Sequence, residues 1–394
     1  MKKLVLIVIL AAFGLMSIAA VNHSDDSATK NTLSSSLTED QRDSKEFKVK
    51  LGGNLEIDLK TGGDIKIEGW SKDVVSVEMK IKGRDADNVK YEIEQSGNRV
   101  TVTNEYKKRL RNNKSNTSVI IKVPNKFNID FETMGGDVAI VSVDGKMKGK
   151  TMGGDLNLSD LKGYLDITTM GGEITLKDSE VDGKVKTMGG EVTVDNVKGD
   201  VNASSMGGDV KYSNVSGNKR SVGNEVDITT MGGDLKVDKA PNGAKLHTMG
   251  GDITVNHAEK YVKAKTMGGD VRIKEVDGWV EATSMGGDVE VKMTGDPKDG
   301  KRDATLTSMS GDVTLIVPAG LSMEIDIELS YTKEHTNCKI ISDFDIKEER
   351  TTEWERDHNG STPKKYIYGT GSVNGGKNKI TLHTVNGNVY LKKG

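Results

Sequence analysis

An acidic residue recurs at a fixed place in a short motif that the chain repeats ten times. The motif reads Thr or Ser, Met, Gly (once Ser), Gly, Asp or Glu, and then Val, Leu or Ile. In stacked repeats these carboxylates would lie about 4.8 Å apart and repel one another. A divalent cation would offset the repulsion through oxygen ligands. The alternative, which we favour, is that each acid caps its own turn. This acid ladder comprises Asp137, Asp155, Glu173, Glu191, Asp209, Asp234, Asp252, Asp270, Asp288 and Asp312.

The calcium β-roll spacing, in which glycine also follows the first variable residue, is not matched, so we predict no metal and no cofactor. The methionine of the motif forms a second ladder. Thioethers bind soft Cu(I), but a flexible apolar side chain that fills a corner of the core explains the same pattern without metal. We favour core packing, because no histidine or cysteine joins the register. These residues are Met134, Met152, Met170, Met188, Met206, Met231, Met249, Met267, Met285 and Met309.

Seven of the nine methionine spacings are 18 residues, and the other two are 25 and 24. The longer copies carry insertions in the turn opposite the motif, and each insertion contains a basic pair. Insertions on one side of a repeat stack often form its binding face, and paired cations suit a phosphate or carboxylate group. Two tolerated surface loops are the alternative. The candidate ligand-binding residues are Lys219, Arg220, Lys298, Lys301 and Arg302.

Catalytic signals are weak. The six histidines are scattered, and no HExxH, GxSxG or phosphate-loop motif occurs. Cys338 lies near His335, but such a pair is usually incidental. Aromatic residues make up 4% of the chain, which leaves few platforms for sugars, and the net charge of −3 gives no field that attracts nucleic acid. We therefore expect a protein that is not an enzyme and binds no nucleic acid.

The elements that position these residues follow from an apolar alternation at period two. Val138 and Ile140 follow one glycine pair, and Leu165 and Ile167 precede another. Alternation of this kind predicts strands with one buried face, and an 18-residue unit buries that face only by stacking on its neighbours. The sequence predicts an all-β fold: a single-chain parallel β-solenoid of about 18 residues per coil, two main strands per coil and atypical capping ends.

The paired glycines predict a sharp corner, because glycine adopts positive φ without steric cost. Ser310 replaces the first glycine in the last copy, so we expect the second glycine to hold the constrained conformation. Substitution of Gly136 by Val should then damage the fold more than substitution of Gly135 by Ser.

The N-terminus has the pattern of a secretory signal. Lys2 and Lys3 precede an apolar run from Leu4 to Ala20, and cleavage after Ala19 fits the small-residue rule. The alternative is an uncleaved anchor, which would be the chain's one contact with a membrane. We predict a signal peptide at 1–20, a flexible linker at 21–45, an N-terminal β region and cap at 46–132, regular repeats at 133–317, and a C-terminal β region and cap at 318–394.

Together these features resemble the toast-rack or "putative adhesin" family of bacterial envelope domains, whose function is unknown. The resemblance runs from about residue 47 to 393. It includes the strand Ile65 to Ile67 with the Gly69-Trp70 step, the repeated Gly-Asp-Val string, Leu315 to Pro318, and a final hairpin that begins at Val373. It implies an all-β solenoid, export across the inner membrane and no established enzyme chemistry.

We expect an exported scaffold, in the periplasm or at the cell surface, that binds an envelope component or a partner protein through an anionic group. The alternatives are a β-helical enzyme that acts on polysaccharides and a structural rod stabilised by metal ions. The missing motifs and scarce aromatic residues favour the scaffold over the enzyme.

Overall fold

The computed structural model describes residues 40–108, 114–216, 225–356 and 362–394, which belong to one compact unit, Thr38–Gly394. The predicted signal peptide and most of the predicted linker lie outside the described residues. The linker boundary at 45 is wrong, because strand β1 (Gln41–Lys48) begins inside it and pairs with β4 (Val74–Lys82). No stretch of the described residues forms a helix with the length and apolar character needed to cross a bilayer.

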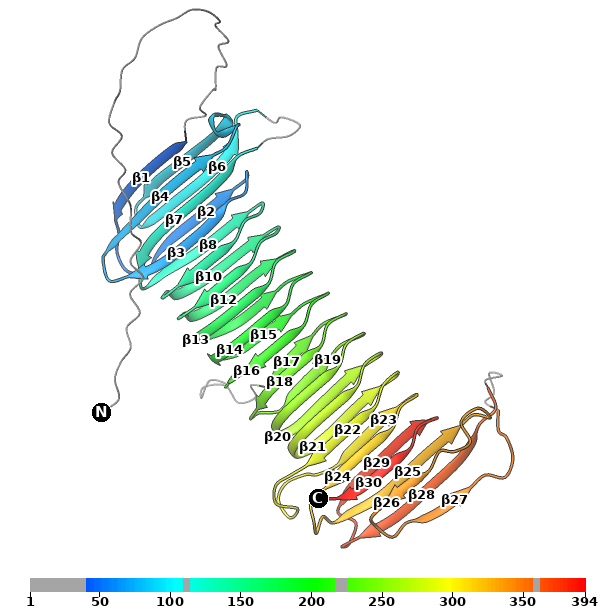
Figure 1. Ribbon diagram of the computed structural model, residues 1–394. Helices are drawn as coiled ribbons and strands as arrows, with labels where there is room; N and C mark the ends of the chain where they lie inside the picture. Colours follow the sequence, from blue (N-terminus) through cyan, green and yellow to red (C-terminus); the bar gives the residue numbers. More distant parts are fainter. Residues whose placement is uncertain (1–39, 109–113, 217–224, 357–361) are drawn as a thin grey trace, which may run out of the picture. The chain divides into compact units, whose positions relative to one another are not determined.

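Strands of successive repeats pair in parallel, with partners 18 residues apart (Figure 1). Leu156, for example, pairs with Val138 on one side and with Ile174 on the other. The first row of strands follows the glycine corner. Its members are β9 (Val138–Val141), β11 (Leu156–Ser159), the start of β13 (Ile174–Lys186), β14 (Val192–Lys198), β16 (Val210–Ser213), β18 (Leu235–Ala240), the starts of β20 (Ile253–Thr266) and β21 (Val271–Ser284), β22 (Val289–Met293) and β24 (Val313–Val317).

A second row precedes the corner, and its inward side chains meet those of the first row in one apolar core. Its partners are also 18 residues apart, as Met147 and Leu165 are. The members are β8 (Phe127–Thr133), β10 (Asp144–Thr151), β12 (Lys162–Thr169), the end of β13, β15 (Val201–Ser204), β17 (Val226–Thr229), β19 (Ala244–His247), the ends of β20 and β21, and β23 (Ala304–Ser308).

The predicted all-β class is confirmed, and the stacking is solenoid-like; the one described helical turn is η1 (Ala86–Asn88). In three repeats the two strands join into one long strand, β13, β20 or β21, that runs through the intervening turn. In the repeats from β9 to β16 this turn holds a residue with positive φ, again at intervals of 18, and in β13 that residue lies within the long strand. Asp and Asn fill most of these positions because they tolerate the left-handed region. They are Ser142, Asp160, Asp178, Asn196 and Asn214.

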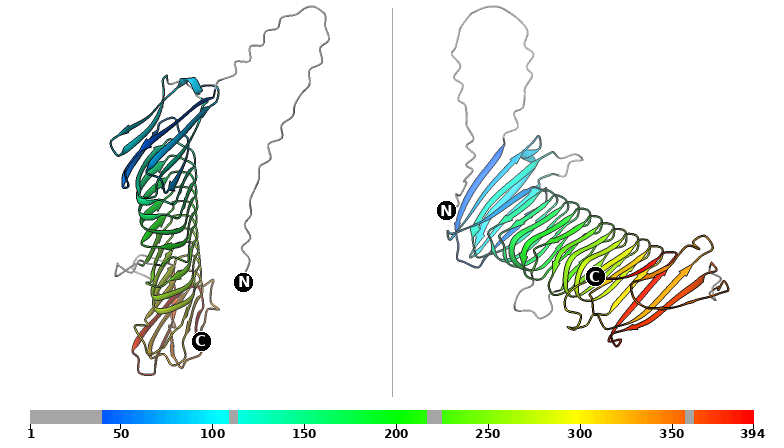
Figure 2. Two further views of the ribbon diagram at one scale, coloured as in Figure 1. Left: turned by 90° about the vertical axis from the view of Figure 1, so that its left-hand side faces the viewer. Right: turned by 60° about the horizontal axis from the view of Figure 1, so that its bottom comes forward.

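The two longer repeats keep the register. Ala203 pairs with Ile228 across the first insertion, and Val280 pairs with Ala304 across the second. The strands on both sides of each insertion therefore keep the pairing of the regular repeats, and the coils remain stacked in one series (Figure 2).

The ends depart from this pattern. β2 (Gly53–Leu59) and β3 (Asp64–Trp70) pair in parallel with β8 and β9, while β4 is antiparallel to β7 (Asn116–Pro124) and β5 (Val89–Ser96) is antiparallel to β6 (Arg99–Tyr106). The outer strand β1 is rich in charged residues, as suits a strand that must not pair with another molecule.

At the C-terminal end, β29 (Asn378–Val385) and β30 (Val389–Lys393) form the last coil against β23 and β24. β25 (Met323–Tyr331) and β26 (Ile340–Ser342) pair in parallel with them. Antiparallel pairing then appears between β25 and β28 (Lys365–Val373), and between β28 and β27 (Lys347–Arg350). All four residues of β27 are charged and exposed, which again protects an outer strand.

Candidate functional site

The glycine corner begins with a buried hydroxyl. The Thr248 hydroxyl donates a hydrogen bond to the carbonyl of Gly233 in the preceding coil (3.0 Å), and it accepts one from the Gly251 N–H in its own coil (3.2 Å). The same coil-to-coil bond recurs from Thr151 through Ser308. The hydroxyl satisfies backbone groups that would otherwise be buried without partners, which explains why the motif opens with Thr or Ser.

The second glycine of each motif is where neighbouring backbones approach most closely. A Cβ built on Gly190 would lie 2.2 Å from the carbonyl oxygen of Gly172, whereas one on the first glycine, Gly153, would meet nothing within 4 Å. The prediction that the second position is the constrained one is confirmed, but its physical reason is broader than expected. Positive φ occurs at Gly136 and Gly154, and the other coils need glycine for the close approach alone.

The acids cap the neighbouring coil. Oδ1 of Asp270 accepts the backbone N–H of Asp288 at 2.8 Å, and equivalent bonds link the other aspartates of the acid ladder to the next coil. We expected each acid to cap its own turn, and this is wrong: the aspartate carboxylates accept the backbone N–H of the next coil instead. The carboxylates have backbone donors, and these hydrogen bonds stabilise the negative charges that otherwise repel.

The ladder is interrupted where glutamate replaces aspartate. Glu191 turns instead to Thr193 (2.9 Å) and to Lys211 (2.7 Å). The Lys211 ammonium lowers the pKa of the Glu191 carboxyl, and the Glu191 carboxylate raises the pKa of Lys211. The additional methylene therefore redirects the carboxylate from the next coil's backbone to a side-chain cation.

The methionines lie outside the core, which corrects the packing prediction. Nine of the ten are 39–58% exposed, and Met170 is half-buried. The described methionines that do fill the core, Met79, Met147, Met293 and Met323, all lie outside the repeated register. The corner is too tight to take a side chain inward because the hydroxyl and the second glycine occupy its inner side. We call the ten residues from Met134 to Met309 the methionine column.

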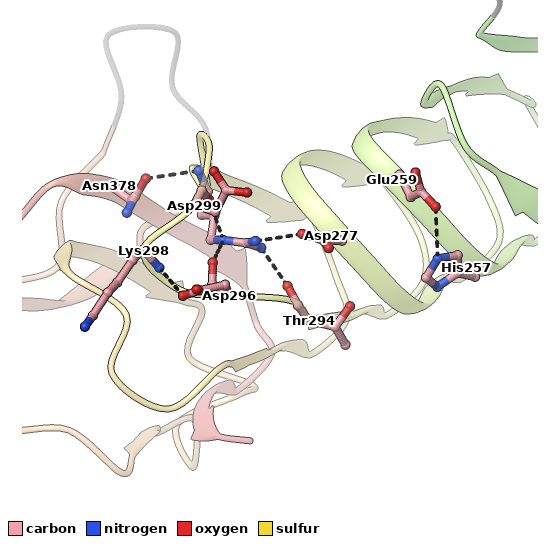
Figure 3. Close-up of polar contacts among 9 residues, drawn as sticks. His257, Glu259, Asp277, Thr294, Asp296, Lys298, Asp299 and Asn378 are labelled. Atoms are coloured by element: carbon pink, nitrogen blue, oxygen red, sulfur yellow. Dashed lines mark hydrogen bonds and ion pairs between the residues drawn. The ribbon is translucent and has the colours of Figure 1, made fainter.

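Arg302 is not available to a ligand, which corrects its assignment as a binding residue. It is 3% exposed, and its guanidinium donates to the carbonyls of Thr294 (2.6 Å), Asp296 (2.7 Å) and Asp299 (3.0 Å) and to the Asp277 carboxylate (2.6 Å). Figure 3 shows these four partners around the inserted loop. The arginine holds the loop together and ties it to the preceding coil.

The other basic candidates are placed differently. Lys298 lies on the same loop, where its backbone N–H donates to Asp296, and its side chain is exposed (Figure 3). Lys301 is exposed but already forms an ion pair with Asp303 (3.0 Å) and lies 5.4 Å from the ring of Trp279. Lys219 and Arg220 lie outside the described residues. The structure therefore brings together Lys298 and Lys301 on one loop, without the guanidinium of Arg302.

An aromatic column adjoins this loop, and our sequence reasoning missed it. The Tyr261 and Trp279 rings stack at 4.8 Å, and a Cβ on Gly243 would collide with the Tyr261 ring. Lys263 and Lys301 both approach the Trp279 ring at 5.4 Å. The three residues are spaced by 18, so the repeat itself contained the signal. Because Gly243 and the lysines cover the rings, the column stabilises the coils rather than offering an open platform for sugars.

The remaining titratable groups of interest make local contacts. Nδ1 of His257 contacts the Glu275 carboxylate (3.2 Å), and Nε2 lies 3.9 Å from the Glu259 carboxylate, a pair drawn in Figure 3. The thiol of Cys338 donates to the carbonyl of His335, and burial raises its pKa. Within residues 40–394, leaving aside the undescribed segments, no group of three or more His, Cys, Asp or Glu is arranged to hold a metal ion.

The hollows that we find in the described surface are open and lined by charged side chains. One of about 260 Å³ lies over β17, β19, β20 and β21, with Lys245, Lys263, Lys265 and Glu281 at its rim. Another of about 250 Å³ lies over β2, β6, β8 and β10 near Arg99. Neither combines an apolar interior with convergent polar groups, as small-molecule sites do.

Stacked coils joined by hydroxyl, glycine and carboxylate ladders define a repetitive all-β protein with solenoid-like stacking. The family model "Toastrack DUF4097" matches residues 53–257 and 223–392. This match spans most of the chain, and the chain belongs to the Toastrack family, in agreement with the resemblance that the repeated motifs indicated. A search of curated proteins gives no match.

Solved structures give similarities that are low in both sequence and superposition. A "putative adhesin" from Bacteroides fragilis is 17% identical, with 68% of this chain and 97% of that chain covered and a TM-score of 0.34. A "putative adhesin" from Parabacteroides distasonis is 16% identical, with 64% and 97% covered and a TM-score of 0.35. At these values the structures support no argument about the role of this chain.

Proposed function

We propose that this protein is a non-enzymatic β-solenoid that acts as a binding or adhesin-like scaffold in the bacterial cell envelope. The observation that carries the proposal is the use of side chains at the glycine corner. The hydroxyls and aspartates, which would be the reactive groups of a repeated active site, are committed to bonds between coils. What remains for other molecules is an extended outer surface with shallow hollows.

In this proposal residues 133–317 form one parallel solenoid of about 18 residues per coil with two main strands each. The regions 46–132 and 318–394 cap it. The antiparallel strands and charged outer strands at both ends support the capping role, because an uncapped coil would pair with another molecule.

Export is the second part of the proposal. The basic start and the apolar run from Leu4 to Ala20 would direct the chain across the inner membrane, with cleavage after Ala19. Cell fractionation followed by N-terminal sequencing of the mature protein tests this part. Recovery of the intact N-terminus from the cytoplasm would contradict it.

The third part concerns the partner. Lys298 and Lys301, together with Lys219 and Arg220, would contact an anionic group of an envelope component or partner protein. Lys301 must then exchange its ion pair with Asp303 for the ligand, which weakens its contribution relative to Lys298.

Binding of the purified protein to isolated envelopes tests the scaffold role. Replacement of Lys219, Arg220, Lys298 and Lys301 by Ser should reduce binding at least threefold, because cations at a contact with anions are removed. A control replaces four exposed lysines outside the two surface hollows, Lys177, Lys186, Lys274 and Lys292 on β13, β21 and β22, by Ser. Equal binding by both variants would remove the loops from the proposal.

An enzymatic role is distinguished by turnover. Incubation of the protein with envelope glycans should release no product. Product release that is abolished by a single carboxylate substitution would replace the scaffold by the alternative of a polysaccharide-active enzyme.

A further inference from the structure

The methionine is the one side chain of the repeated motif that the corner does not use internally. The hydroxyl, the second glycine and the aspartates each contact a neighbouring coil. The methionine instead lies at the surface in nine copies, with about two-fifths or more of its area exposed. An apolar side chain kept at the surface in successive coils needs an explanation other than core packing.

The chemical identity of this residue points to sulfur. Inside the core the same register position changes freely among aliphatic residues, as Val138, Leu156 and Ile174 show. Outward positions diverge further: Lys184, Asn202 and Asp227 occupy equivalent places. At the corner, however, all ten copies have methionine. An apolar contact would accept leucine or isoleucine there, so the feature that has been kept is the thioether.

The coil geometry places neighbouring thioether side chains on adjacent strands. The N–H of Met152 bonds to the Thr133 carbonyl and that of Met170 bonds to the Thr151 carbonyl, both at 3.2 Å, so the corners follow one another at the usual strand spacing of about 4.8 Å. A metal–sulfur bond is about 2.3 Å in zinc sites, so one ion between two sulfurs spans roughly 4.6 Å. Methionine has three rotatable bonds with which to adjust this distance.

Access and charge agree with this geometry. The first glycine of the motif follows each methionine in nine copies, so the next residue along the chain has no side chain that could cover the thioether. The acid ladder lies three residues further along the same corner and supplies negative charge. Thioethers are soft, neutral ligands that select Cu(I) over Zn²⁺, Mg²⁺ or Ca²⁺.

We propose that the methionine column binds soft monovalent cations of the Cu(I) type, each held between the thioethers of adjacent coils. The proposal is separate from the scaffold role and requires no ion at the acid ladder. It predicts several equivalent sites along the column, selective against hard divalent cations.

Two matched variants of the full chain test the importance of adjacency. The first replaces Met152, Met188, Met231, Met267 and Met309 by Leu, which leaves every second methionine. The second replaces Met134, Met152, Met170, Met188 and Met206 by Leu, which leaves five contiguous methionines. Both retain five thioethers and an unbroken apolar column, and a variant with Leu at all ten positions gives the background. Circular dichroism should show unchanged β structure in each variant.

Equilibrium dialysis with Ag(I), and anaerobic titration with Cu(I) against a competing chelator, measure affinity and stoichiometry. The contiguous variant should retain about half of the wild-type sites at wild-type affinity, and the alternating variant should bind at least tenfold more weakly. In ¹³C-methyl spectra, the column methionines should shift while buried Met79 and Met147 should not. Equal binding by the two variants, or wild-type binding at the level of the ten-leucine background, would overturn the proposal.

Discussion

The glycine corner and the turn opposite to it differ in how much variation each accepts. At the corner the motif is kept in ten copies, and its hydroxyl, second glycine and aspartate each contact the adjacent coil. The opposite turn varies in residue type and takes two insertions without loss of register. The comparison teaches that the sequence must repeat where the backbones of neighbouring coils lie close together. The turn can change in length where its contacts are local.

The largest effect should come from placing a side chain at the tightest point of the corner. Gly154→Ala places a Cβ 2.2 Å from the Gly136 carbonyl oxygen at a φ of +90°, and should cost about 3 kcal/mol or more of unfolding free energy. A Cβ on Gly153 lies in open space, so Gly153→Ala should change the free energy of unfolding by less than about 0.5 kcal/mol. Denaturant unfolding measures both, and equal losses would end the distinction between the two glycines.

A comparable test of the opposite turn concerns Arg302, whose hydrogen bonds hold the inserted loop together. Arg302→Met leaves the Asp277 carboxylate and three loop carbonyls without their donor, and should cost about 2–3 kcal/mol. The exposed neighbour provides the control: Lys301→Met should cost less than about 0.5 kcal/mol. If Arg302→Met left the melting temperature unchanged, the loop would not depend on this residue.

The acid ladder should give a smaller loss. Asp270→Ala removes the acceptor for the Asp288 N–H and should cost about 1–2 kcal/mol, whereas Asp270→Asn keeps an acceptor oxygen and should cost less. Addition of EDTA should leave the melting temperature of the wild type unchanged, because backbone donors occupy the carboxylates. A lower melting temperature in EDTA would restore the metal-stabilised alternative.

The smallest effect on the free energy of unfolding should come from the Glu191–Lys211 ion pair, where the acid ladder is interrupted. Because the pKa of Glu191 is lowered in the folded state, its contribution is complete above its unfolded pKa of about 4.3 and is lost as pH falls through the folded value. Lys211→Met should therefore cost about 0.5 kcal/mol at neutral pH and progressively less as the pH falls below about 4.3. Unfolding curves at a series of pH values test this, and a difference that grows in acid would have the wrong sign.

Alternation and spacing were sufficient to predict much of the fold. Because the strands of the regular repeats pair with the copy 18 residues away, their register is a property of the chain's own periodicity. The same alternation of apolar residues continues outside the repeats near Val74, Val100 and Val119, where β4, β6 and β7 lie. The antiparallel ends could not be derived in the same way, because they lack a repeat that dictates partners.

For individual side chains, too, the sequence determined one part of their role and the tertiary structure another. The sequence by itself determined that carboxylates, hydroxyls, glycines and methionines form columns, because a constant period places equivalent residues above one another. Tertiary structure alone decided the direction in which each column faces. The close approach of backbones at the second glycine excludes methionine from the interior, and the desolvated loop carbonyls draw Arg302 inward from the surface where its charge would otherwise remain.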